Sequence, residues 1–78
     1  MGNDRPVPTK CWEKFLKSKD CYYKSTEASH DKWRCKGCIR SIIFRGNQKE
    51  IPFAHIKTNL TSMNISKEEF WNWIKENC

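Results

Sequence analysis

A histidine set among lysines and arginines is the feature of this chain most able to do chemistry. Lys32 and Arg34 follow His30 at two-residue spacing, so a strand would place all three side chains on one face. An imidazole can take the proton from a ribose 2′-hydroxyl near neutral pH, and neighbouring cations can stabilise the charge that develops on the phosphate. His30 is therefore a candidate for metal-free RNA cleavage, although a histidine in a basic protein can equally be a solvated surface residue.

The positive charge is concentrated in one part of the sequence. The 78 residues include 15 Lys and Arg against 9 Asp and Glu, a net charge of +6. Residues 10–45 hold ten of the basic and four of the acidic residues, so the whole excess lies there and the flanking segments are neutral. Such a field favours a polyanionic partner, nucleic acid first and an acidic protein second.

Alternating side chains predict that His30 lies on a β-hairpin. Residues 29–34 and 39–45 have strand composition, and Lys36-Gly37 fits a two-residue turn in which the glycine adopts the left-handed conformation. That turn would pair His30 with Ile43. A short strand over residues 21–24 and a loop over residues 25–28 would precede the hairpin.

The predicted hairpin has two different faces because side chains alternate along a strand. One face is apolar, should pack on the helices, and consists of Trp33, Ile42 and Phe44. The other is open and basic, and carries His30, Lys32, Arg34 and Arg45.

Three helices complete the predicted domain. Apolar residues at helical spacing indicate a first helix that begins at Thr9 as its N-cap. A second helix follows Ile51-Pro52 and closes at Asn64. In the third, Ser66 is the N-cap and Glu69 completes a capping box.

These elements predict one α+β domain, in which a three-stranded antiparallel sheet packs on helices. Residues 1–8, with two prolines, are expected to form an extended leader, and residues 9–78 the domain. No run of about eighteen apolar residues is present, so we expect no membrane span. Without an apolar signal-peptide stretch, the expected location is the cytoplasm.

The five cysteines allow more than one interpretation. An odd count without a secretion signal predicts reduced thiols rather than a disulfide framework. Cys35 and Cys38 have the spacing of half a zinc site, which is the minority interpretation because no second closely spaced pair accompanies them. The alternative is two thiols opposite each other beside the hairpin turn, able to form a disulfide on oxidation.

The order of the motifs is more specific than any one of them. Ala28-Ser29-His30 leads into Asp31-Lys32-Trp33 and a hairpin, then come Lys49-Glu50-Ile51-Pro52 and His55-Ile56. Over roughly residues 9 to 77, this order resembles the HicA family of toxins. The resemblance implies a fold similar to a double-stranded RNA-binding domain.

The resemblance also implies a function. The protein would be the toxin of a type II toxin–antitoxin system, a ribonuclease that cleaves mRNA without a metal or other cofactor and so inhibits translation and growth. A HicB-type antitoxin would neutralise it. The family's Gly-Ser-His motif falls on Ser29-His30, so His30 would be the catalytic general base or acid. Ala28 replaces the motif's glycine, which would permit a positive φ or a close approach of RNA.

Further residues are assigned to RNA binding by their positions near this motif. The candidate RNA contacts are Lys24, Ser29, Lys32, Arg34 and Arg45. Tyr23 or Trp71 could stack on bases if exposed, and His55 is expected to have a packing or hydrogen-bonding role. Two other functions compete with catalysis: a non-catalytic RNA-binding module of the same fold, and a small zinc-ribbon-like interaction protein built on Cys35 and Cys38.

Overall fold

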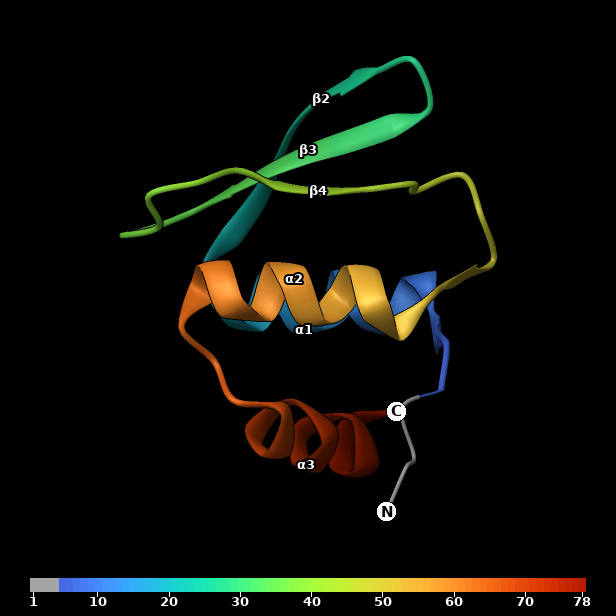
Figure 1. Cartoon of the computed structure of the whole chain (residues 1–78), viewed down its shortest axis with the longest axis vertical. Coiled ribbons are helices and arrows are strands. Elements are labelled where there is room, and N and C mark those ends of the chain that lie inside the picture. The colour runs from blue at the N-terminus through green and yellow to red at the C-terminus, as the bar shows by residue number, and fades with distance from the viewer. Residues whose placement is uncertain (1–4) are drawn as a thin grey trace.

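A three-stranded antiparallel sheet lies on two helices, and a third helix lies on their far side (Figure 1). The computed structural model describes residues 5–78. Its elements are β1 (Val7–Pro8), α1 (Thr9–Ser18), β2 (Cys21–Glu27), β3 (His30–Cys35), β4 (Ile42–Phe44), β5 (Glu50–Ile51), α2 (Phe53–Met63) and α3 (Lys67–Asn77). The predicted α+β class and the three-stranded antiparallel sheet are confirmed.

The two-residue turn of the sheet joins β2 to β3, whereas the sequence predicted it between β3 and the strand that follows. β2 continues to Glu27, which pairs with His30, so Ala28 and Ser29 alone connect β2 to β3. The predicted loop over residues 25–28 is therefore wrong for residues 25–27, which belong to the strand. Ala28 has φ +58°, in the left-handed region that a glycine would occupy without strain. The turn places His30 at the very start of β3.

The register between β3 and β4 also differs from the prediction. The structure pairs Lys32 with Ile43 and Asp31 with Phe44, whereas the predicted hairpin paired His30 with Ile43. Gly37 does adopt a positive φ of +83°, but the chain then continues through a loop and re-enters the sheet only at β4. Because the shift is an even number of residues, it leaves every side chain on its predicted face.

The predicted apolar face of the hairpin is confirmed. Trp33, Ile42 and Phe44 are at most 4% exposed and pack toward the helices. Aromatic rings link this face to the other layers, since Trp12 of α1 meets the rings of both Phe44 and Phe70 edge-on. The opposite face of the sheet is left for solvent or a partner.

Local signals set the helix ends. The N-cap of α1 is Pro8, one residue earlier than the predicted Thr9, and the Thr9 hydroxyl donates to the backbone oxygen of Gln48. Asn64 closes α2 in the left-handed conformation with φ +60°, as predicted. The Ser66 hydroxyl accepts the backbone N–H of Glu69 at 3.1 Å, which confirms the predicted N-cap of α3.

Part of the predicted leader belongs to the folded domain. Val7 and Pro8 form β1, which pairs antiparallel with β5, and Val7 is completely buried. The guanidinium of Arg5 lies 4.5 Å from the centroid of the Trp71 ring. The first four residues of the leader lie outside the described part of the chain.

The expectation of five reduced thiols is wrong for this structure. Disulfides join Cys11 to Cys78 and Cys21 to Cys35, and Cys38 is free. The pairing of β2 with β3 places Cys21 directly opposite Cys35, with 3.9 Å between their Cα atoms. The cysteine count could not reveal this pairing, because it depends on which strands are neighbours. In the described range, no helix has the length and apolar character to cross a membrane.

Candidate functional site

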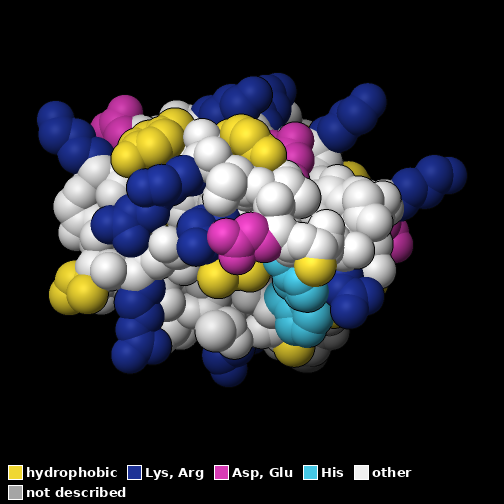
Figure 2. Space-filling model, turned by 90° about the horizontal axis from the view of Figure 1, so that it is seen from above, with side chains coloured by type: hydrophobic (Ala, Val, Ile, Leu, Met, Phe, Trp, Pro, Cys, Tyr) yellow, Lys and Arg dark blue, Asp and Glu magenta, His cyan; other side chains and the backbone are white. Residues whose placement is uncertain are grey.

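The outer face of the sheet carries the basic residues that the sequence singles out. His30, Lys32 and Arg34 alternate along β3 with the buried Trp33 and Cys35, so they lie on the face of the sheet opposite its core face. Figure 2, seen from the sheet side, shows lysine and arginine side chains across this face, with histidine atoms at its surface. The predicted open, basic face is therefore present.

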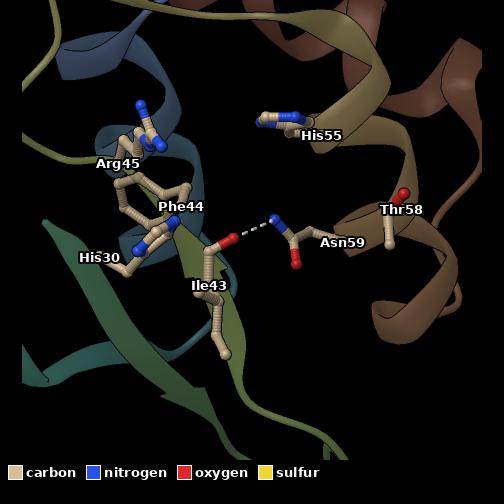
Figure 3. Close-up of a pocket in the computed structure, with 7 residues that line it drawn as sticks. All are labelled: His30, Ile43, Phe44, Arg45, His55, Thr58 and Asn59. Carbon is tan, nitrogen blue, oxygen red and sulfur yellow. Dashed lines mark hydrogen bonds between the residues drawn. The ribbon is translucent and has the colours of Figure 1, made fainter. Parts of the chain in front are cut away.

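A pocket of about 260 Å³ lies beside His30. One wall comes from the ends of β3 and β4 and the other from α2 (Figure 3). Its lining residues are His30, Ile43, Phe44, Arg45, His55, Thr58 and Asn59. The volume is just below the roughly 300–1,000 Å³ of small-ligand pockets, so it suits one phosphodiester linkage rather than a duplex.

The α2 wall is held in place by one buried side chain. Asn59 is 7% exposed, and its amide donates a hydrogen bond of 3.1 Å to the backbone oxygen of Ile43. His55 and Thr58 lie four and one residues before Asn59, so all three share a helix face. The bond therefore fixes the position of His55 relative to β4.

The structure gives His55 a different place from the expected one. Its side chain is exposed, makes no hydrogen bond within the described residues, and lies on the same pocket as His30. In Figure 3 it extends from the first turn of α2 toward β4, with His30 and Arg45 on the strand side. The sequence did contain a signal for this position. His55 and Asn59 are four residues apart, so they share a helix face, and that face lies next to the buried residues Ile56 and Leu60.

A second hollow, of about 450 Å³, shares His30 with this pocket. Glu27, Ala28, Lys32 and Ile43 line it together with His30. Glu27 is directly opposite His30 in the register of β2 and β3, so an acidic side chain borders the motif on this face of the sheet. Sequence reasoning missed Glu27 because it placed that residue in a loop.

The predicted RNA contacts divide into two groups. Lys32 and Arg45 line the hollows around His30, and both are part of the candidate site. Arg34 lies further along β3, where its guanidinium donates to the Ser41 hydroxyl at 3.3 Å. Ser29 in the turn is exposed, and so is Lys24, which sits where the register of β2 shifts. Neither lines the two hollows.

The exposed aromatic side chain on the open face is that of Tyr22, whereas the sequence suggested Tyr23 or Trp71 for stacking on bases. Tyr22 pairs with Arg34 and is 57% exposed. Tyr23 is also exposed, but it lies on the opposite face, with its ring 6.3 Å from that of Trp33. Trp71 is half-buried and stacks on Phe53. Tyr22 is thus the ring beside the basic residues that is open to a base.

The zinc alternative loses a ligand in this structure. Cys35 forms a disulfide with Cys21, so the Cys35 and Cys38 pair does not offer two thiolates. Over residues 5–78, no group of three or more potential metal-ligating side chains comes together.

Comparison with protein-family models, curated proteins and solved structures finds no match. The resemblance to HicA toxins therefore stays a prediction. What the site can do follows from its own geometry: an imidazole, a guanidinium and a second imidazole surround one small pocket on a basic sheet face.

Proposed function

We propose that this protein is a metal-independent endoribonuclease that acts as the toxin of a type II toxin–antitoxin pair. The observation that carries the proposal is that His30 and Arg45 line the same open pocket. An imidazole can remove the 2′-hydroxyl proton, and a guanidinium can bind the non-bridging phosphate oxygens as negative charge develops on them. Together they supply a proton acceptor and a charge-stabilising group for cleavage of an RNA strand without a metal.

The surroundings of the pocket support RNA as the substrate. Lys32 and Arg34 continue along the same face of β3, and Tyr22 adds an exposed ring beside them. Cations that contact phosphates and a ring that stacks on a base are the usual means of binding single-stranded RNA. The likeness to a double-stranded RNA-binding domain belongs to this proposal, and the arrangement of sheet on helices supports it.

The toxin role adds mRNA as the target, the cytoplasm as the location and an antitoxin protein as the partner. A HicB-type antitoxin would cover the open face and exclude RNA from it. Since this face carries an excess of positive charge, the antitoxin surface that fits it is acidic. Inhibition would then be competitive with RNA and would weaken as salt rises.

The test compares wild-type protein with His30→Ala on a short single-stranded RNA in the presence of EDTA. The expected result is cleavage by the wild type, a loss of about 10²–10⁴-fold in the variant, and nearly equal RNA affinity. Undiminished cleavage by the variant would overturn the role of His30. Expression in bacteria should arrest growth, and co-expression of the neighbouring open reading frame should relieve the arrest.

A non-catalytic RNA-binding module is the second candidate, and the exposed Tyr22 beside Arg34 favours it as much as it favours an enzyme. Both candidates bind RNA through the same face with a strong salt dependence. The module would bind RNA and leave it intact at every pH, which the cleavage assay detects directly.

A further inference from the structure

We propose that His55 is a second catalytic residue, which carries the second of the two protons that RNA cleavage moves. The proposal rests on the ribonuclease function proposed above and adds to it a residue on a different element. His55 projects from the first turn of α2 into the pocket that His30 enters from β3 (Figure 3).

The chemistry of RNA cleavage calls for two proton-transfer groups. The 2′-oxygen attacks phosphorus and loses its proton, a new bond forms between the 2′-oxygen and phosphorus, and the bond from phosphorus to the 5′-oxygen breaks. The departing 5′-oxygen takes up a proton, which leaves a 2′,3′-cyclic phosphate and a 5′-hydroxyl. In an in-line displacement the attacking and leaving oxygens lie on opposite sides of phosphorus. One imidazole on one wall of a pocket cannot serve both oxygens at once.

The structure places an imidazole on each of two walls. His30 comes from the strand wall and His55 from the helix wall, and the pocket between these walls has about 260 Å³. One neutral imidazole accepts the 2′-hydroxyl proton, and the other, protonated, donates to the 5′-oxygen. The two rings end in exchanged protonation states, and proton exchange with water restores them. No metal and no further reactant is needed.

The remaining groups at the pocket fit this division of roles. Arg45 lines the same pocket and supplies a fixed positive charge for the non-bridging oxygens, which leaves the imidazoles free for proton transfer. The titratable groups around the phosphate site are His30, His55 and Arg45. Glu27 lies across from His30 on β2, and Lys32 lies beside it on β3. Of these side-chain types, imidazole is the one that can both accept and donate a proton near neutral pH.

The backbone that carries His55 is held in place by two hydrogen bonds. Its backbone N–H donates to the oxygen of Pro52 at 3.0 Å, which fixes it in the first turn of α2. One turn later, the bond from Asn59 to Ile43 ties that helix to β4. The imidazole itself makes no hydrogen bond within residues 5–78, so both of its nitrogens are available to substrate.

The test uses His55→Ala and His55→Gln, with Lys57→Ala as the control. Lys57 is an exposed cation on the same helix that does not line the pocket, so its removal matches the loss of a surface side chain from α2. On a short RNA we expect the His55 variants to lose about 10²–10⁴-fold in cleavage rate. Their thermal unfolding midpoints and RNA affinities should stay close to those of the wild type. The Lys57 variant should cleave at nearly the wild-type rate.

A pH profile and an activated substrate separate proton transfer from mere binding. The wild-type cleavage rate should follow a bell-shaped pH dependence, and each histidine variant should lose one limb of it. A ribonucleotide ester with a p-nitrophenoxide leaving group needs no general acid. The variant of whichever histidine acts as the acid should therefore regain activity on that ester, while the other variant should not.

The outcomes distinguish this inference from the function on which it rests. A His55→Ala rate near that of the wild type, beside an inactive His30→Ala protein, would overturn the role of His55 and leave the ribonuclease in place. A loss in both variants that the activated ester relieves in neither would also overturn it. Wild-type protein that binds RNA but never cleaves it would overturn the proposed function itself.

Discussion

The amide of Asn59 in α2 donates a hydrogen bond of 3.1 Å to the backbone oxygen of Ile43 in β4. This bond joins the two walls of the pocket that contains His30 and His55. It also satisfies the amide of a side chain whose residue is only 7% exposed, which is the usual condition for burying an amide. The position of the helix wall thus depends on a contact between residues that are far apart in the sequence.

Removing this bond should affect both stability and catalysis. We expect Asn59→Ala to lower the free energy of unfolding by about 1–3 kcal/mol, because the backbone oxygen of Ile43 loses its buried partner. Cleavage should fall further than RNA affinity, since His55 loses its fixed distance from β4. Urea unfolding and cleavage assays measure the two effects. Thr61→Ala is the matched control, because it removes only the exposed bond from Thr61 to Lys57.

Substitution of Ala28 by glycine should raise the free energy of unfolding, whereas Asn59→Ala should lower it. A non-glycine residue in the left-handed region is strained by roughly 1–2 kcal/mol, and Ala28 has φ +58°. Glycine relieves that strain but has more entropy to lose on folding, roughly 0.5–1 kcal/mol. Ala28→Gly should therefore raise the free energy of unfolding by about 0.5–1 kcal/mol.

The helix offers the control for this substitution. Ala54 is exposed in the first turn of α2, where Ala54→Gly should lower the free energy of unfolding by up to about 1 kcal/mol. Thermal or urea unfolding of both variants shows whether the two changes in the free energy of unfolding have opposite signs. Destabilisation of the same size in both variants would contradict a left-handed Ala28.

The disulfides predict how the protein responds to a reductant. Titration with a thiol reagent in denaturant should find one free thiol, Cys38, and reduction should raise the number to five. Cys21→Ser with Cys35→Ser removes the shorter of the two cross-links and should lower the free energy of unfolding by about 3 kcal/mol. Urea unfolding without reductant measures it. Five reactive thiols in the unreduced protein would rule out both pairings.

Salt dependence tests the basic face. If Lys32 contacts a phosphate, Lys32→Ala should weaken binding to single-stranded RNA and reduce the slope of log K against log salt by about 0.7. Lys75→Ala makes the same change in charge on α3, in the layer furthest from the sheet, and should leave the slope nearly unchanged. Fluorescence anisotropy over a salt series gives both slopes. Equal slopes for the two variants would place RNA elsewhere than the open face.

Several features of the fold follow from the sequence because they depend on near neighbours. The alternation of side chains along the hairpin assigned Trp33 and Phe44 to the core and His30 to the open face. This assignment is correct even though the register between β3 and β4 differs from the predicted one. The caps at Asn64 and Ser66 were also predictable, since a helix end is satisfied by residues within one turn of it. The confinement of positive charge to residues 10–45 is likewise visible in the sequence.

Only the tertiary structure decided which distant residues meet. The turn at Ala28, the bond from Cys21 to Cys35 and the shared pocket of His30 and His55 all depend on how strands and helices pack. Strands and helices repeat every 2 or 3.6 residues, so neighbouring side chains in the sequence are enough to predict them. The contacts between distant residues depend instead on loop lengths and on the burial of the whole core. The sequence by itself determined one histidine on a basic face, and the packing of α2 on β4 brought the second one to it.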